Sequence, residues 1–269
     1  MNAIRYIAFL DILGFADQVE HKPLDEIIHK ISLSLQSLQV AQHLSVFLHD
    51  QGKEGFGLAV NAKCLEAFSF SDTFVLSSRD ASPASFYQLI AGTAVLAQHL
   101  FSVQFPVRGA LTCGEADFVP GTNHLVGKAI IRAARLEKIQ DWFGVIIDPS
   151  FPNSESLSQF PLIKPLVVKY DVPWKSNAGF SGPCWTINWR FNLEAENGIS
   201  SLFQQSEDDE NKRKVQNTLN YCKFLRSNNL AYGSLRTEKG EQIHVPWLRG
   251  MWLGQKPPGT PGNKHGDEY

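Results

Sequence analysis

The sequence lacks the features that mark several large classes of protein. Its four cysteines stand singly with no CxxC pair, so we expect no disulfide framework and a reducing, cytoplasmic location. It has no run of roughly 18 apolar residues and no charged-then-apolar signal at its N-terminus, so we expect no membrane partner. The net charge is −2, which gives no basic field for nucleic acid, and we expect no nucleic-acid partner.

Familiar catalytic and nucleotide-binding motifs are also missing. The chain contains no GxxxxGK[ST], GxGxxG, HExxH or GxSxG, and its eight histidines show no metal-ligand spacing. These absences argue against a P-loop, a dinucleotide fold, a zinc protease and a serine hydrolase. A polyphosphate ligand would therefore depend on local charges and metal.

Apolar residues are plentiful, and their spacing predicts an α+β fold. The 269 residues are 43% hydrophobic, with 18 Phe and 6 Trp, which is enough for one large core. Strand patterns and helix patterns alternate along the first part of the chain. The expected strands are Tyr6–Leu10, a hairpin about Ser71–Asp72, 105–116 (entering a turn), 145–148, 166–172 and 184–191. The expected helices run from Leu24 to about Phe47, over Ser85–Phe101, and from Gly127 to a stop at Gly144.

The C-terminal third has a different composition. Residues 206–229 begin with acids and continue into basic residues, an order that suits a helix dipole. Residues 254–269 are rich in Pro and Gly and are predicted to be disordered. We therefore expect a catalytic domain over 1–191, a helical extension over 192–253 and a disordered tail over 254–269.

Two aspartates end predicted strands. Asp11 follows the apolar run Tyr6–Leu10, and Asp72 lies in the hairpin turn. If the two strands are neighbours, both carboxylates project at one edge of the sheet, where Mg²⁺ or Mn²⁺ could be held with substrate phosphates. The alternative is that both are ordinary turn residues.

Four segments, taken in order, resemble the class III nucleotidyl cyclases. They are Asp11-Ile12-Leu13-Gly14-Phe15, then Ser71-Asp72, then Arg108 to Gly114, then Gly127 followed by Ala133-Ala134-Arg135-Leu136-Glu137. The resemblance implies a ferredoxin-like βαββαβ core and a head-to-tail homodimer with two active sites at the interface. It implies two Mn²⁺ or Mg²⁺ ions per site, held by Asp11 and Asp72, with the backbone carbonyl of Ile12 as a further ligand. The catalytic arginine would be Arg135, supplied by the partner subunit.

The same resemblance suggests residues that bind the substrate. Gly14 would let the turn wrap the triphosphate, and Phe15 would pack back towards the core beside it. A triphosphate-binding lysine is expected on a late strand, with Lys175 the first choice and Lys169 the second. Alternatively, Lys175 is a solvated lysine, and Arg135 is an exposed helix arginine paired with Glu137 or Glu115.

The base-reading positions depart from the family pattern. Where adenylate cyclases carry Lys and Asp, and guanylate cyclases Glu and Cys, this chain has Phe68 and His124. Phe68 could stack on a base but cannot read its edge, while the alternatives are a core phenylalanine and a loop histidine. The family asparagine on the helix is replaced by Ile131, which indicates either a weakened catalyst or a site rebuilt by a neighbour such as Arg132.

A compact cyclase without the purine code resembles the Pycsar-type pyrimidine cyclases of bacterial anti-phage defence. The resemblance implies an enzyme, a uridylate cyclase that converts UTP to 3′,5′-cyclic UMP and pyrophosphate as a second messenger. Two alternatives are a cytidylate cyclase that makes cyclic CMP and a degenerate cyclase domain that binds a nucleotide or a partner. A purine cyclase is the weakest alternative.

Overall fold

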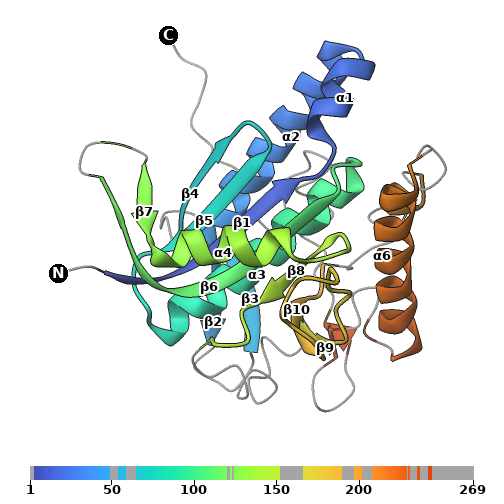
Figure 1. Cartoon of the computed structure of the whole chain (residues 1–269). Helices are drawn as coiled ribbons and strands as arrows, with labels where there is room; N and C mark the ends of the chain where they lie inside the picture. The colour runs from blue at the N-terminus through green and yellow to red at the C-terminus, as the bar shows by residue number, and fades with distance from the viewer. Residues whose placement is uncertain are drawn as a thin grey trace, which may run out of the picture.

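The computed structural model describes residues 3–48, 54–58, 65–119, 122, 124–151, 166–189, 197–201, 208–228, 230, 235–236 and 242–243. Within these residues the chain is α+β, with one mixed sheet between layers of helix (Figure 1). The predicted tail, 254–269, and the predicted domain boundary at 191–192 lie outside the described residues.

The central sheet has eight strands. In chain order they are β1 (Ile4–Ile12), β4 (Leu65–Phe70), β5 (Thr73–Ser78), β6 (Val107–Phe118), β7 (Leu125–Gly127), β8 (Gly144–Ile147), β9 (Val167–Tyr170) and β10 (Cys184–Ile187). Their order across the sheet is β4-β5-β1-β6-β8-β10-β9, and β7 pairs with the far end of β6. Neighbours are antiparallel except β6 and β8, which are parallel. Two separate pairs are β2 (Leu44–Leu48) with β3 (Glu54–Leu58), and β11 (Leu235–Arg236) with β12 (Gln242–Ile243).

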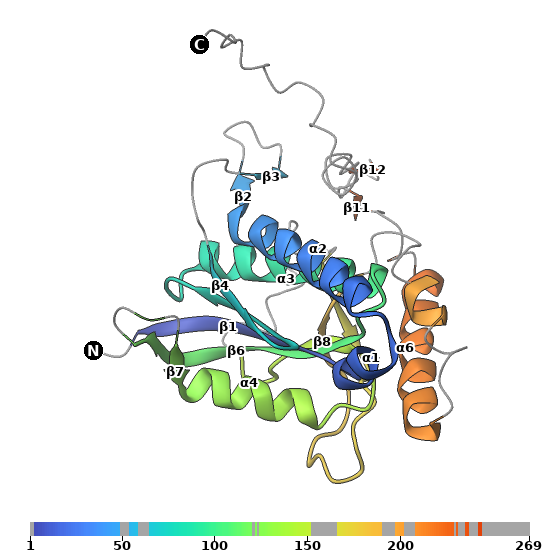
Figure 2. The same cartoon turned by 90° about the horizontal axis from the view of Figure 1, so that it is seen from above.

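Helices cover both faces of the sheet. They are α1 (Phe15–His21), α2 (Leu24–His43), α3 (Pro83–Ser102), α4 (Lys128–Lys138) and α6 (Asp209–Ser227). Figure 2 shows α2 and α3 on one face, α4 on the other, and α6 beside the sheet. The order β1, α2, β4, β5, α3, β6 is therefore a β-α-β-β-α-β unit with both of its helices on one face.

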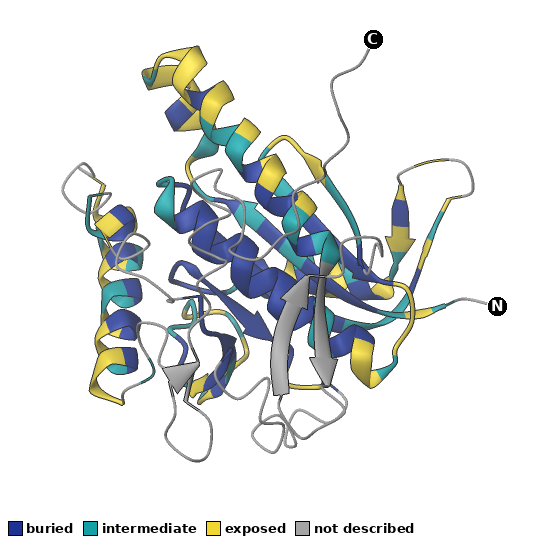
Figure 3. Cartoon of the chain, turned by 180° about the vertical axis from the view of Figure 1, so that it is seen from behind, coloured by how far each residue is buried: buried dark blue, intermediate teal, exposed yellow. Residues whose placement is uncertain are grey.

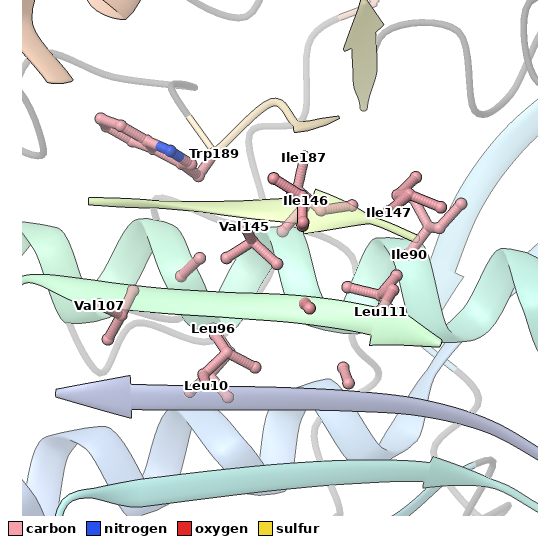
Figure 4. Close-up of a cluster of buried hydrophobic side chains, with 14 of the residues drawn as sticks. Leu10, Ile90, Leu96, Val107, Leu111, Val145, Ile146, Ile147, Ile187 and Trp189 are labelled. Atoms are coloured by element: carbon pink, nitrogen blue, oxygen red, sulfur yellow. The ribbon is translucent and has the colours of Figure 1, made fainter. Parts of the chain in front are cut away.

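The main core lies between the sheet and α3. This helix begins at a Ser82 N-cap followed by Pro83, and it is buried along most of its length (Figure 3). Side chains of β1, α3, β6 and β8 meet there, as Figure 4 shows for Leu10, Leu96, Val107 and others. The largest buried side chains include Trp142 and Trp189.

β1 divides its side chains between the two faces with the period of two that a strand imposes. Leu10 and Ile12 belong to the main core, whereas Ile7 and Phe9 belong to a smaller cluster beneath α4. Asp11 shares the alternation of Ile7 and Phe9, so it lies on the α4 face. The strand and the hairpin at Ser71–Asp72 are thus confirmed, with the strand two residues longer at each end.

Three sequence predictions are wrong in detail. The helix from Leu24 ends at His43 rather than near Phe47, because residues 44–48 pair with β3. The strand over 105–116 enters its turn two residues later than predicted, since β6 runs to Phe118 before the chain turns back into β7. Gly144 does not stop a helix, because α4 ends at Lys138 and Gly144 begins β8, where a Cβ would strike the Trp142 ring at 2.5 Å.

α6 confirms the helix predicted over 206–229 and packs against the sheet. Asp208 caps its N-terminus, accepting a hydrogen bond from the Asn211 amide at 3.0 Å. Tyr221 is fully buried, its ring contacts Trp142 and Tyr170, and its hydroxyl donates to the Ile187 carbonyl. The helix therefore shares one core with the strands.

Candidate active site

The C-terminal end of β1 places Asp11 between two neighbouring strands. Asp11 is directly opposite Thr73 of β5 on one side and Arg108 of β6 on the other. Directly opposed residues point to the same face of a sheet, so these three side chains form a row beneath α4. The Thr73 hydroxyl donates to Asp11 Oδ1 at 3.0 Å, which orients the carboxylate.

Asp72 lies at the same edge of the sheet as Asp11. Its carbonyl accepts a hydrogen bond from the Ile12 amide at 2.9 Å, so the hairpin turn is tied to the end of β1. The negative charge of Asp72 raises the pKa of Asp11, as expected for neighbouring carboxylates. The structure therefore brings together the two aspartates that the sequence singled out, and with them the backbone of Ile12.

Burial makes Asp11 an unusual carboxylate. Burial raises the pKa of Asp11 from 3.8 to about 6, with smaller contributions from the charges of Glu137 and Asp72. The hydrogen bond from Thr73 and the charge of Arg108 oppose this rise. An ionised Asp11 beside a second carboxylate therefore favours a bound cation, which would offset both burial and repulsion.

The two aspartates fit a divalent ion that keeps other oxygen ligands. Within the described chain no group of three or more His, Cys, Asp and Glu side chains is gathered as a ligand set. Mg²⁺ and Mn²⁺ do not require one, since they are usually held by one or two carboxylates with waters and substrate phosphates. Asp11 and Asp72 supply such a pair at one edge.

The loop after β1 begins with a glycine that its conformation requires. Gly14 has a φ of +69° and precedes α1, a left-handed conformation that glycine adopts at low cost. Phe15 then turns back and packs edge-on against Phe105, with 6.0 Å between ring centroids. Phe15 is only partly buried, so its ring lines the junction of β1 and α1.

A buried ion pair stands beside Asp11. Arg108 Nε donates to Glu137 Oε1 at 2.6 Å, and Nη1 donates to the Gln140 carbonyl at 3.1 Å. Arg108 is 6% exposed and Glu137 is 2% exposed. The pair joins β6 to the last turn of α4 next to the aspartate.

Sequence analysis gave Arg108 no role and considered Glu137 only as a partner for Arg135. The signal that could have identified the pair is a charged residue within an apolar strand, because a buried charge requires a partner.

Lys175 belongs to the loop after β9 and lies near the same charged residues. Its amide donates to the Ile139 carbonyl at 2.9 Å, which anchors it beside the end of α4. Burial lowers the pKa of Lys175, and the charges of Arg108 and Lys214 lower it further, whereas Glu210 and Glu137 raise it. Arg108 and Glu137 thus act on both Asp11 and Lys175. Lys169, the second choice, is exposed on β9 opposite Trp185.

Arg135 is exposed on α4, and no hydrogen bond or ion pair joins it to another described residue. The two suggested partners are engaged elsewhere, since Glu137 binds Arg108 and Glu115 binds Lys128 at 2.8 Å. Within the part of the chain that the structure describes, the guanidinium therefore has no partner.

Ile131 and Arg132, the two other residues of α4 considered for the site, have different environments. Ile131 is 53% exposed on the same helix. Arg132 is bound through two nitrogens to the buried Asp148, so it is committed to the fold and does not rebuild the position of Ile131.

The base-reading candidates lie along the α4 face. Phe68 of β4 packs in the smaller cluster and contacts Phe118 edge-on, with 6.1 Å between ring centroids. His124 is exposed and precedes Leu125, which is opposite Phe118. Phe68 and His124 are thus linked only indirectly, through Phe118 and Leu125, and Phe68 also packs in the smaller core cluster.

Comparison with known proteins gives no assignment: no protein-family model matches the chain, and neither does any curated protein sequence. Among the described residues no helix is long and apolar enough to cross a lipid bilayer.

Proposed function

We propose that the chain is a nucleotidyl cyclase that converts UTP to 3′,5′-cyclic UMP and pyrophosphate. The observation that carries the proposal is the placement of Asp11 and Asp72 at one edge of the sheet, tied by the hydrogen bond from Ile12 to Asp72. The β-α-β-β-α-β order around them supports it, because the class III cyclases that the sequence resembles use a ferredoxin-like core of this order.

In the proposed reaction the 3′-hydroxyl attacks the α-phosphorus in line and pyrophosphate leaves. Mg²⁺ or Mn²⁺ held by Asp11, Asp72 and the Ile12 carbonyl would activate the hydroxyl and neutralise phosphate charge. Thr73 orients Asp11 so that its carboxylate faces the α4 side. Lys175 binds the triphosphate as a positive charge beside the same edge.

Arg135 acts in a homodimer. It has no partner among the described residues of its own chain, which fits a guanidinium that completes the site of the other subunit. There it stabilises the negative charge that develops on the α-phosphoryl oxygens.

The base is a pyrimidine because the purine-reading positions hold Phe68 and His124. Phe68 offers a ring face and no hydrogen bond, so an adenine or guanine edge would stay unpaired. An unpaired buried polar group costs about 1–3 kcal/mol, which corresponds to roughly 10- to 100-fold discrimination. His124 can donate to uracil O4 or accept from the cytosine amino group, depending on its tautomer. We choose UTP over CTP because the sequence resembles the pyrimidine cyclases of anti-phage defence.

A second candidate is a nucleotide-binding module without turnover. Ile131 favours it, since an exposed isoleucine stands on α4 where the family carries an asparagine. Asp11, Asp72 and an unpaired Arg135 favour the enzyme, because binding alone does not need all three.

The test is a four-way competition of ATP, GTP, CTP and UTP at equal concentration with Mn²⁺, with products resolved by mass. We expect cyclic UMP first, cyclic CMP second and little purine product. Asp11→Ala and Asp72→Ala should each abolish product while the protein stays folded and dimeric, and Asp171→Ala, an exposed aspartate after β9, is the matched control.

Dominant cyclic AMP or cyclic GMP would overturn the roles of Phe68 and His124. Dominant cyclic CMP would change only the choice of base. Binding of a triphosphate without any cyclic product would favour the module.

A further inference from the structure

The C-terminal helix α6 is fastened to the segment that follows α4. Arg213 binds Asp141 through two nitrogens, at 2.7 and 3.2 Å, and Asn217 Nδ2 donates to the Asp141 carbonyl at 2.7 Å. The next residue, Thr218, accepts a hydrogen bond from the Phe143 amide through its hydroxyl at 2.8 Å. These contacts fix the N-terminal half of α6, which Figure 1 shows beside β8, β9 and β10.

The same segment also carries the candidate site. Glu137 holds Arg108, the Ile139 carbonyl holds the Lys175 amide, and the Asp141 amide donates to the Pro173 carbonyl at 2.8 Å. Residues 137–141 therefore connect three things: the buried ion pair, the loop of Lys175 and the first turns of α6. Lys214 follows Arg213 directly, so it is brought to this junction by the fold.

Lys214 lies at the junction where Lys175 is anchored, and it holds a carboxylate. Lys214 Nζ binds Glu210 Oε1 at 2.6 Å, and its side chain is 11% exposed while that of Glu210 is 53% exposed. The hydrogen bond from Lys214 lowers the pKa of Glu210, and the charges of Lys214, Lys175 and Arg213 lower it further. Glu210 is thus an accessible anion that pairs with Lys214 and lies in the field of Lys175 and Arg213.

We propose that Lys214 is a second polyphosphate-binding lysine, which holds the terminal phosphates of a nucleoside triphosphate together with Lys175. When no phosphate is bound, the Glu210 carboxylate occupies the position of the terminal phosphates next to Lys214. When a phosphate binds, Glu210 moves into solvent. The nature of the ligand rests on the proposed function, whereas the placement of both lysines at one junction rests on the contacts of residues 139–141.

The charge balance explains why this exchange is favourable. One exposed carboxylate offers a single negative charge to Lys214 and leaves Lys175 without an ion pair among the described residues. A triphosphate offers several charges, on oxygens that accept strong charge-assisted hydrogen bonds. Lys214 is already ordered by α6 and largely shielded from water, so little side-chain freedom is lost when phosphate binds.

The proposal predicts opposite effects for two neighbouring substitutions. The probe is inorganic tripolyphosphate, titrated calorimetrically into the full chain. Lys214→Gln should weaken its binding about tenfold, Lys214→Arg should largely retain it, and Glu210→Gln should tighten it several-fold. Lys223→Gln, an exposed lysine further along α6, should leave it unchanged. With UTP, Lys214→Gln should raise KM about tenfold and change kcat little.

An unchanged affinity in Lys214→Gln, weaker binding in Glu210→Gln, or a wild-type chain that does not bind tripolyphosphate would each overturn the proposal. Thermal unfolding verifies that every variant is folded. The two proposals fail separately. Lys214-dependent binding without cyclic product refutes only the cyclase, and cyclase activity with an unchanged KM in Lys214→Gln refutes only the lysine pair.

Discussion

Replacement of Asp11 by asparagine should make the metal-free protein more stable at neutral pH while it abolishes activity. Asparagine has nearly the same shape, and its side-chain oxygen can still accept the hydrogen bond from Thr73. What it removes is a negative charge that is partly buried and close to Glu137 and Asp72. The substitution therefore tests whether the negative charge of Asp11 destabilises the metal-free fold, as expected for a residue whose role is to bind a cation.

The size of the effect follows from the pKa of Asp11. A rise from 3.8 to about 6 corresponds to about 3 kcal/mol at pH 8, since a tenfold change in a protonation equilibrium is worth about 1.4 kcal/mol. Water screens the part of the carboxyl that stays exposed, so we expect a gain of about 1–2 kcal/mol in the free energy of unfolding.

The sign of the pH dependence is fixed by the direction of the shift. Because the folded pKa of Asp11 is raised, the stability linked to its protonation is present below pH 3.8 and is lost as pH rises through about 6. The advantage of Asp11→Asn should therefore be small at pH 4.5 and grow to its full value by pH 7.5.

Urea unfolding in EDTA between pH 4.5 and 8 measures this advantage, and Asp171→Asn serves as the control for loss of an exposed charge. Mn²⁺ should stabilise the wild type and leave Asp11→Asn unaffected. The difference in the free energy of unfolding between the two proteins should therefore narrow or reverse when metal is added. A variant that is equally or less stable than the wild type at pH 7.5 in EDTA would refute the reasoning.

Three further changes probe the site and its support. Glu137→Gln strands the buried guanidinium of Arg108 and should cost about 3–5 kcal/mol in urea unfolding, so a loss below about 1 kcal/mol would contradict the ion pair. Arg135→Ala and Asp72→Ala proteins should each be inactive but regain activity after verified subunit exchange, whereas absence of complementation would place each site within one chain. Gly109→Ala puts a Cβ at 2.4 Å from the Phe9 carbonyl oxygen and should lower the free energy of unfolding by about 1–3 kcal/mol, which a thermal melt unchanged from the wild type would contradict.

Local sequence patterns predicted most elements because each depends on its own residues. The alternation in β1 and the hairpin of β4 and β5 follow from a period of two, and the helical spacing located α2, α3 and α4. The end of α2 was missed since residues 44–48 are apolar and continue the helical spacing. What ends the helix there is the pairing of β2 with β3, a contact that the helical pattern does not reveal.

The candidate site was predictable where it lies at strand ends and unpredictable where distant segments meet. Asp11 and Asp72 each follow or interrupt an apolar strand, so the sequence indicated them directly. The partnership of Arg108 and Glu137 spans 29 residues and depends on how α4 crosses β6. Lys175 was selected by resemblance, and its position next to Ile139 comes from a contact between loops. No local pattern linked α6 to these residues.

The attachment of α6 also has a consequence for the order in which the chain can fold during synthesis. The hydrogen bonds of Arg213, Asn217 and Thr218 reach back 72 to 76 residues, and Tyr221 covers Trp142 and Tyr170. While translation has not passed α6, the nascent chain holds the β8–β10 side of the sheet without its cover, and two large aromatic rings remain open to water. Closure of that side is therefore a late event, and the interval before it is when the emerging polypeptide is most exposed to aggregation and most in need of chaperones.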